Sequence, residues 1–486
     1  MVHLIAVAIG IMLIFMGVLM GIPAIVDLEG GFADWNVFAL SATASIFVGS
    51  MCVLTFAGKN YKVELRSAYL LTVCSWLALS LVAALPFWFS GTGISFTDAV
   101  FEAVSGLTTT GSTVLTGLDA MPPGLLLWRG ILQWIGGVGI IVMAVLALPF
   151  LRVGGMQLYQ LESSDFADKT SDRITEIVIQ ILFVYLALTV MSGLLYMVFG
   201  MTLLQATIHA MTTVSTGGFS TSDQSMGLFN SSSIKWVAVI FMIAGSLPFN
   251  SYVKALRQKN IKAMAKDSQI RVFFALIMIA VGLLVLNLWL GNATLGAVRI
   301  TDVVFSVVSV VTTTGYVSGD YLLWGSFAVV LFFFLTFVGG CAGSTAGGIK
   351  IFRFEIMSRE IRRQCMIMVH PHRVVMNTLN GRSIRRSVTA SVGMYFILFF
   401  LTVVIITVIN AAIGIDYITS FSAALTAVSN VGPGLGQIIG PSGTFSTLPD
   451  ASKWVLDFAM LAGRLEFMAI YVLLAPIFWQ DLVWVR

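Results

Sequence analysis

The chain has 486 residues, a mean hydropathy of +0.95 and a formal net charge of +4 at pH 7. Hydrophobic residues make up 58 % of it and charged residues only 10 %, whereas an ordinary soluble domain is about 25 % charged. This composition excludes a soluble globular protein, and the Lys and Arg residues flank apolar segments instead of forming a basic domain, which argues against nucleic-acid binding.

Ten apolar segments are long enough to cross a membrane, for which about 20 residues are needed. The sequence therefore predicts an all-α polytopic membrane protein. The first segment lacks a basic leader and a cleavage site, so we expect it to be a retained transmembrane helix. The predicted spans cover residues 2–26, 36–57, 66–90, 124–151, 174–199, 234–256, 270–291, 323–350, 386–413 and 453–479.

Four shorter apolar segments lie between these spans, at residues 97–108, 203–214, 301–312 and 418–429. Each is too short to cross a membrane and is followed at once by Thr, Ser, Asn and Gly. A short helix that ends in a polar extended strand and returns to the same side is typical of a re-entrant loop. We therefore expect four re-entrant pore half-helices in addition to the ten spans.

The four short segments mark an internal repeat of about 100 residues. Each copy has the order span, short helix, polar strand, span, and residues 1–57 add two helices outside the repeat. The predicted pore units, arranged around one ion pathway, are residues 58–151, 152–256, 257–365 and 366–486. The glycines that anchor the four copies are Gly111, Gly217, Gly315 and Gly432.

Most of the 27 Lys and Arg residues lie in loops that can share one side of the membrane. An excess of positive charge marks the cytoplasmic side, so both termini are expected there and the re-entrant segments enter from outside. Asp98, Glu102 and Asp302 lie near the starts of two short helices. They are either outer-mouth charges that attract cations or caps of those helices.

A Thr/Ser/Gly strand at membrane depth leaves backbone carbonyls without helical partners, which is tolerated where the backbone is buried in protein or lines a wet cavity. Carbonyls from four such strands can replace the hydration shell of a monovalent cation, and glycine permits the dihedral angles this requires. No carboxylate occurs within the strands, which disfavours divalent ions. The alternative interpretation is four Gly/Thr kinks at helix contacts, where small residues are common.

Five glycines between residues 339 and 348 interrupt the eighth span. They should break the helix just below the polar strands. The stretch resembles a phosphate-binding loop in composition, but it lacks the Gly-Lys-Ser/Thr ending, so nucleotide binding is rejected. We interpret it as a flexible constriction or gate, and a close-packing patch is the alternative.

Arg464 lies eleven residues after Lys453, near the middle of the last span. Ionisable residues inside a membrane are candidates for function. Glu466 is two residues further on and would point to another face of a helix, which makes it a poor partner. We interpret Arg464 as an electrostatic barrier or gate, and pairing with backbone carbonyls is the structural alternative.

Seven stretches of the sequence are specific enough to indicate a family: GLTTTGST at 106–113, LQWIGGVGIIV at 132–142, STGGFSTSD at 215–223, TTTGY at 312–316, GGCAGSTAGGIK at 339–350, SNVGPGLG at 429–436 and GRLE at 463–466. Through them the chain resembles, over essentially its whole length, the Trk/Ktr/HKT superfamily of potassium transporters, and most closely the bacterial Trk-type membrane subunit.

The resemblance implies four pore-forming units around one K⁺ path, with K⁺ as the transported ion and no cofactor in this chain. By resemblance the selectivity filter consists of Thr109, Thr110, Gly111, Ser215, Thr216, Gly217, Thr313, Thr314, Gly315, Asn430, Val431 and Gly432. The gate likewise consists of Gly339, Gly340, Gly343, Ser344, Thr345, Gly347, Gly348 and Arg464. In plant relatives a serine at the first filter glycine accompanies Na⁺ preference, so Gly111 favours K⁺.

The resemblance also implies a homodimer in the bacterial inner membrane, bound to a cytoplasmic nucleotide-binding regulatory ring that would hold any ATP or NAD. The sequence thus predicts channel-like K⁺ uptake through a carbonyl filter. Two alternatives stay open. One is a secondary transporter that couples K⁺ or Na⁺ to H⁺, because carriers also use broken helices. The other is a poorly selective monovalent cation channel. An enzyme is not indicated, because the sequence offers no catalytic set.

Overall fold

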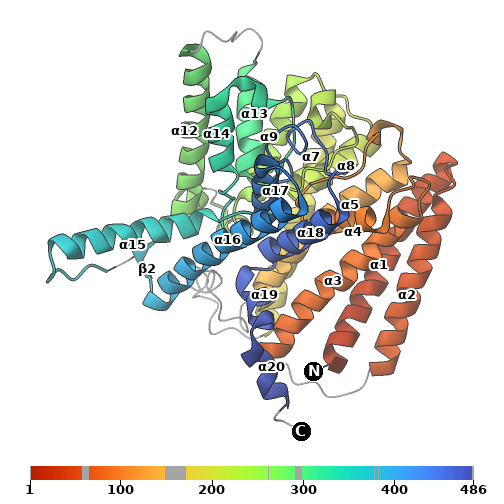
Figure 1. The fold of residues 1–486 in the computed structure, drawn as a ribbon, viewed down its shortest axis with the longest axis horizontal. Helices are drawn as coiled ribbons and strands as arrows, with labels where there is room; N and C mark the ends of the chain where they lie inside the picture. The colour runs from red at the N-terminus through yellow and green to blue at the C-terminus, as the bar shows by residue number, and fades with distance from the viewer. Residues whose placement is uncertain are drawn as a thin grey trace.

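The structure, a computed structural model, describes residues 2–56, 65–147, 171–260, 262–290, 298–376, 378–380 and 382–483. The described part is almost entirely helical (Figure 1), and its one sheet pairs strands β1 (Thr378–Leu379) and β2 (Arg382–Ser383) antiparallel, with Thr378 opposite Ser383. The predicted limits of the first pore unit, at residues 57–58 and 151–152, lie outside the described residues.

The helices follow the predicted order of units. The N-terminal pair is α1 (Val2–Gly30) and α2 (Trp35–Phe56). Unit 1 contains α3 (Leu65–Phe89), α4 (Phe96–Leu107) and α5 (Pro123–Ala147), and unit 2 contains α7 (Ser171–Val198), α8 (Leu203–Val214), α9 (Ser232–Ser246) and α10 (Phe249–Gln258). Unit 3 contains α11 (Lys262–Ala265), α12 (Ser268–Leu290), α13 (Ile300–Val311), α14 (Ser326–Leu335) and α15 (Ile351–Val369). Unit 4 contains α16 (Arg386–Ile413), α17 (Tyr417–Ser429), α18 (Asp450–Arg464), α19 (Phe467–Leu474) and α20 (Pro476–Val483).

Seven of the described helices are long and apolar enough to cross a membrane, and the pair α9 and α10, bent by 89°, adds an eighth if it is counted as one span. The chain is therefore an all-helical, multi-pass membrane protein. The predicted count of ten spans is not confirmed, because three predicted spans are not continuous helices. Segment 234–256 breaks at Pro248, which lacks the N–H that a continuing helix needs. Segment 323–350 stops being helical at Leu335, and segment 453–479 is divided among α18, α19 and α20.

Four short helices, α4, α8, α13 and α17, match the four predicted short segments, each beginning within one residue of the predicted start. Side-chain caps fix where three of them begin. The Ser95 hydroxyl accepts a hydrogen bond from the Asp98 N–H in α4, and the Asp416 carboxylate accepts one from the Thr419 N–H in α17. Thr202 and Gln205 form a capping box at the start of α8.

All four short helices end in the same backbone motif. In α4 the Thr109 N–H donates to Gly106 O (3.0 Å) and the Thr110 N–H to Ser105 O (2.9 Å), with Thr109 in the left-handed region at φ +54°. Glycine and asparagine adopt this conformation readily, whereas a β-branched residue is strained there by about 1–3 kcal/mol. The equivalent left-handed residues are Thr216 (φ +52°), Thr313 (φ +57°) and Asn430 (φ +53°).

In units 1, 2 and 4 a glycine lets the helix that follows the strand lie directly against the end of the short helix. A Cβ on Gly136 of α5 would come within 1.9 Å of Leu107 O. The same atom on Gly245 of α9 would come within 2.6 Å of Val214 O, and on Gly463 of α18 within 2.0 Å of Val428 O. These three glycines therefore define equivalent positions in α5, α9 and α18.

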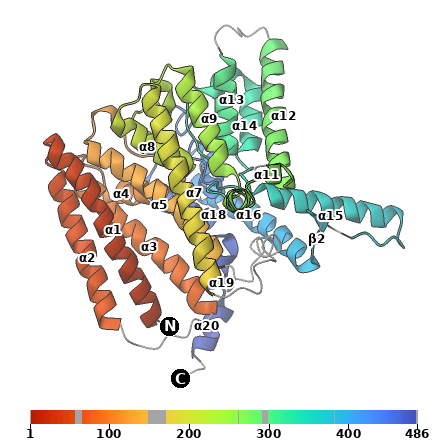
Figure 2. The same cartoon turned by 180° about the vertical axis from the view of Figure 1, so that it is seen from behind.

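The outer parts of the molecule differ from one end to the other. Helix α15 projects away from the rest of the molecule (Figures 1 and 2), and the start of α1 lies at the same end of the molecule as α20.

Candidate functional site

The four polar strands that follow the short helices form a closed ring. In each strand one left-handed glycine lies so close to the backbone of a neighbouring strand that a Cβ would overlap a carbonyl oxygen or press against it. The last contact returns to the first strand, so the units follow one another in the order 1, 2, 3, 4 around one axis. The distances from an added Cβ are Gly111 to Gly217 O 2.2 Å, Gly218 to Thr314 O 1.8 Å, Gly315 to Val431 O 1.9 Å and Gly432 to Thr110 O 2.8 Å.

The structure corrects the predicted register of the second strand. Gly111, Gly315 and Gly432 have φ of +83°, +76° and +104°, and the glycine with the matching φ of +81° in the second strand is Gly218. Ser215 ends α8 as its C-cap residue. Residues 216–218 therefore take the places of residues 109–111, and anchoring the repeat on Gly217 is wrong by one residue.

Several carbonyls of the ring have no protein donor. Among the hydrogen bonds between described residues, none ends on the carbonyl oxygen of Thr110, Gly111, Gly218, Thr314, Gly315 or Val431. Two equivalent carbonyls are engaged, since Gly217 O accepts from Gln133 Nε2 (2.6 Å) and Gly432 O from Ser112 Oγ (3.0 Å). A carbonyl buried without a donor is costly, so these oxygens are suited to water or a cation.

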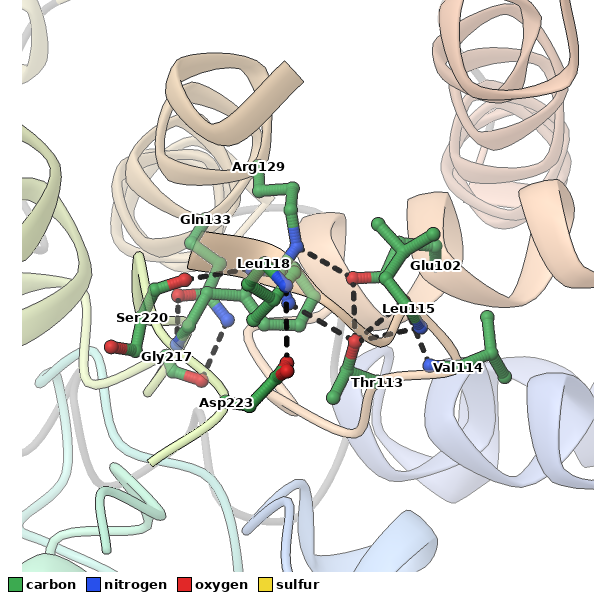
Figure 3. Close-up of polar contacts among 11 residues, drawn as sticks. Glu102, Thr113, Val114, Leu115, Leu118, Arg129, Gln133, Gly217, Ser220 and Asp223 are labelled. Atoms are coloured by element: carbon green, nitrogen blue, oxygen red, sulfur yellow. Dashed lines mark hydrogen bonds and ion pairs between the residues drawn. The ribbon is translucent and has the colours of Figure 1, made fainter. Parts of the chain in front are cut away.

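A cavity of about 240 Å³ opens on one side of the ring, and the four ring glycines Gly111, Gly218, Gly315 and Gly432 line it. Most of its lining residues are Ser, Thr and Gly, and Arg129 and Asp223 are the charged ones. The Asp223 carboxylate accepts a hydrogen bond from the Gly117 N–H (2.8 Å) and another from the Leu118 N–H (3.2 Å), the latter drawn in Figure 3. The cavity is thus a vestibule that leads to the ring.

A buried ion pair lies behind the first two strands (Figure 3). Arg129 Nε donates to Glu102 Oε1 at 2.7 Å, and their side chains are 1 % and 0 % exposed. Glu102 also accepts from Thr113 Oγ1 and the Val114 N–H, whereas Arg129 Nη1 donates to Ser220 O (2.8 Å). The pair therefore fastens the first strand to the second.

Gln133 holds the second strand at two points. Its Nε2 donates to Gly217 O (2.6 Å), and its Oε1 accepts from the Phe219 N–H (3.0 Å) (Figure 3). The equivalent positions in α9 and α18, three residues before Gly245 and Gly463, are occupied by Met242 and Met460. Unit 1 thus supplies a clamp that units 2 and 4 do not. The sequence analysis missed both Arg129 and Gln133, although two polar residues four apart on an apolar helix share one face.

Two further ion pairs join neighbouring units. Lys453 on α18 reaches Asp98 of α4 (Nζ to Oδ1, 2.5 Å), and Lys235 on α9 reaches Asp302 of α13 (2.7 Å). They link unit 4 to unit 1 and unit 2 to unit 3. Asp98, Asp302 and Glu102 are therefore ion-paired residues and not free charges at a pore mouth.

The glycine-rich chain between α14 and α15 contains no helix, as its five glycines predict, and it lies against three of the short-helix ends. Thr345 Oγ1 donates to Val214 O (3.1 Å) and Gly245 O (3.0 Å). The Gly347 N–H donates to Thr313 Oγ1 (2.6 Å), and the Gly348 N–H donates to Ser429 O (2.7 Å). None of the loop residues lines the vestibule.

The other predicted gate residues shape the loop itself. Gly339 N donates to Ile349 O (3.0 Å), and Gly340 O accepts from the Ile351 N–H (3.1 Å). Ser344 Oγ donates to Cys341 O (2.7 Å). Gly343 O accepts from the N–H of Phe249 (3.0 Å), which ties the loop to the start of α10.

Arg464 ends α18 and is 7 % exposed, and its Nε and Nη2 have no hydrogen-bond partner among the described residues. It lies near the uncharged Tyr185 side chain on α7 of unit 2 and near Lys350 beside the loop, whose positive charge repels it. Glu466 instead forms an ion pair with Arg353 of α15, whose Nη2 lies 2.6 and 2.7 Å from the two carboxylate oxygens. The Arg464 guanidinium of unit 4 therefore lies near residues of units 2 and 3, and its Nε and Nη2 have no hydrogen-bond partner among the described residues.

The Arg129–Glu102 pair allows a direct test of how the strands are fastened. We expect Arg129→Met to destabilise the protein by about 3–5 kcal/mol, because it leaves the Glu102 carboxylate buried without its cation. The double variant Arg129→Met/Glu102→Gln should recover part of that loss. Unfolding in detergent, followed by intrinsic fluorescence, measures both, and a double variant no more stable than Arg129→Met would contradict this account of the pair.

The comparisons with known proteins agree with this architecture. Residues 35–485 match the family model TrkH, described as cation transport protein. The chain is 41 % identical over 468 residues to the Trk system potassium uptake protein TrkI of Halomonas elongata, covering 96 % of this chain and 94 % of that protein. It is 35 % identical over 479 residues to TrkH of Escherichia coli K12, covering 97 % and 98 %.

A solved structure is also similar. The crystal structure of the potassium transporter TrkH from Vibrio parahaemolyticus superimposes with a TM-score of 0.91 at 33 % identity, covering 99 % of this chain and 100 % of that one. The match to the family model, the two relatives and this structure extend over nearly the whole chain. The chain therefore belongs to the TrkH family of cation transport proteins.

Proposed function

We propose that this protein takes up K⁺ across the bacterial inner membrane through the axis enclosed by the four polar strands. The observation that carries the proposal is the closed ring, in which four left-handed glycines abut four neighbouring carbonyls. The names of the relatives, Trk system potassium uptake proteins, support the choice of ion.

The filter of this proposal consists of the ring residues in the corrected register. Donor-free carbonyls of the strands replace part of the water around a K⁺ ion. The C-terminal ends of α4, α8, α13 and α17, which carry partial negative charge, stabilise the cation further. The proposed filter residues are Thr109, Thr110, Gly111, Thr216, Gly217, Gly218, Thr313, Thr314, Gly315, Asn430, Val431 and Gly432.

The gate of this proposal is the glycine-rich loop together with Arg464. The loop is bonded to the end of α8, to Thr313 of the third strand and to the end of α17, so its displacement would change the inner end of the ring. The positive charge of Arg464 near the same end opposes the passage of a cation. We further propose a homodimer on a cytoplasmic nucleotide-binding ring, with both termini in the cytoplasm.

A second candidate is a poorly selective monovalent cation channel. The observation that favours it is that Gly217 O and Gly432 O are engaged by Gln133 and Ser112, so the ring offers unequal ligands around the axis. A carrier that couples K⁺ to H⁺ is the third reading, and it depends on a proton-binding group in the membrane.

Expression in a bacterium that lacks its own K⁺ uptake systems tests the proposal. We expect growth at low K⁺ and saturable K⁺ uptake, with Na⁺ as a poor competitor. Equal uptake of Na⁺ and K⁺ would favour the poorly selective channel. Recordings from the purified protein in planar bilayers then separate a channel from a carrier, because only a channel shows discrete openings at rates far above carrier turnover.

A further inference from the structure

Asp457 on α18 is an acidic side chain buried in the membrane part of the protein without a partner. It is 4 % exposed, and neither carboxyl oxygen has a hydrogen-bond partner among the described residues. Native proteins rarely leave a buried carboxyl in this state, and an ionised one would be very costly without a donor or a cation. The side chain therefore needs a ligand other than the described protein groups.

The contacts one turn to either side place Asp457 behind the filter. Four residues earlier, Lys453 reaches Asp98 at the start of α4 (2.5 Å). Three residues later, Met460 O accepts from Nδ2 of the filter residue Asn430 (3.0 Å). Residues 453, 457 and 460 share one face of a helix. Asp457 thus lies between an outer ion pair and the level of the ring, on the face of α18 that packs against units 1 and 4.

The internal repeat does not require an acid at this position. Counting six residues back from the equivalent glycines Gly136, Gly245 and Gly463 gives Gly130 in α5, Val239 in α9 and Asp457 in α18. Gly130 lies against Ile208 of the next unit, with an added Cβ 3.3 Å from its Cγ2. Small or apolar residues fill this position in two units, so the carboxyl in unit 4 has another role.

The charged groups around Asp457 are already paired, with one exception. Lys453 pairs with Asp98, and Glu102 of α4 pairs with Arg129. Beyond the end of α18, Glu466 pairs with Arg353. Helix α17 carries no charged residue. In α16, Asn410 contacts α18 by accepting a hydrogen bond from Ser452, and the charged Arg386 lies at the opposite end of α16. The exception is Arg464, seven residues further along α18 on the same face.

We propose that Asp457 is a proton-binding site linked to K⁺ in the filter. In the conformation described here the carboxyl holds its proton, because no donor or cation is bonded to it. When K⁺ conduction brings water or rearranged side chains to this face, the O–H bond breaks, H⁺ leaves to water and the carboxylate remains. A carboxylate behind the ring attracts a cation there, so proton release and K⁺ binding favour each other.

This inference rests on the proposed K⁺ pathway and makes a specific pH prediction. With Asp457 neutral at low pH, apparent affinity for K⁺ should be low, and it should rise by about tenfold as the pH is raised and the proton leaves. Asp457→Asn, which mimics the protonated form, should behave at every pH as the unmodified protein does at low pH. Asp457→Glu should keep the pH dependence.

The experiment measures K⁺ uptake against K⁺ concentration between pH 5.5 and 9 in proteoliposomes, with pH equal on both sides. The control is Asp450→Asn, which removes a 66 %-exposed acid from the same helix and should leave the pH profile unchanged. An Asp457→Asn protein that keeps the original pH profile overturns the inference. The inference is also overturned if the apparent K⁺ affinity of Asp457→Asn at low pH differs severalfold from that of the unmodified protein at the same pH.

A second measurement does not depend on transport. Infrared difference spectra of the purified protein, with minus without K⁺, should show that K⁺ removes a protonated-carboxyl band. The Asp457→Asn variant should not show this change. If this band is found but no K⁺ uptake occurs, the proposed function fails and the proton site stands. If uptake occurs and no K⁺-dependent carboxyl band is found, the proton site fails and the proposed function stands.

Discussion

Replacing Gly218 by alanine should lower the rate of K⁺ uptake at least tenfold relative to the unmodified protein. A Cβ at this position lies 1.8 Å from Thr314 O, and the φ of +81° costs a non-glycine residue about 1–2 kcal/mol. Backbone has to move, so the contact between the second and third strands is lost. Uptake of K⁺, normalised to the amount of protein in the membrane, measures the effect.

Two matched variants show whether the corrected register is right. Gly217→Ala should reduce uptake less than Gly218→Ala, because the three atoms nearest to its Cβ belong to the Gln133 side chain, at 2.3 to 2.8 Å, and not to the backbone. Gly117→Ala imposes a similar backbone strain (φ +74°) with no atom within 4 Å of the new Cβ, so uptake should be nearly normal. If Gly217→Ala abolished K⁺ uptake and Gly218→Ala did not, the register anchored on Gly217, as expected from the sequence, would be the right one.

Substituting Thr345 by valine should raise the K⁺ flux severalfold. The change conserves shape but removes the hydroxyl that bonds Val214 O, Gly245 O and Thr216 Oγ1, each bond contributing about 0.5–1.5 kcal/mol. The loop then leaves its position below the second strand more often. Deleting part of residues 340–347 should have the same effect to a greater extent.

Ser344→Ala is the control for this gate prediction, because the Ser344 hydroxyl bonds only Cys341 O within the loop itself. Its flux should stay close to that of the unmodified protein. Single-channel recordings and uptake rates both report the outcome. Unchanged or lower flux in Thr345→Val, with normal amounts of protein in the membrane, would remove the loop from the gate.

The sequence predicts best those features that depend on local composition. The four short helices are found within a residue of their expected starts because each is an apolar segment of fixed length with its polar strand directly after it. The break before α15 follows from five glycines in ten residues. The family resemblance over the whole chain is likewise confirmed by the relatives and by the solved structure.

Features that depend on distant contacts could not be predicted in this way. Residues 217 and 218 are both glycine, and only the backbone angles identify the one that matches Gly111. Arg129 and Glu102 lie in different helices, so their pairing depends on how α5 packs on α4. The interruption after Arg464 lies at Leu465 and Glu466, neither of which is proline or glycine, and Glu466 itself adopts φ +66° and pairs with Arg353.

The ring has a consequence for the order in which the molecule is made. Its closing contact joins Gly432 to Thr110, more than 300 residues apart in the chain. Contacts over such separations form late, because the entropy of closing a long loop must first be overcome. When synthesis has reached only α16, the chain contains three of the four strands, each with a strained threonine in the left-handed region, and the ring is still open. The fourth strand, which has asparagine at that position, closes the ring. The least strained strand is therefore the last to be synthesised, and it is the strand that separates the proposed pathway from the surrounding lipid.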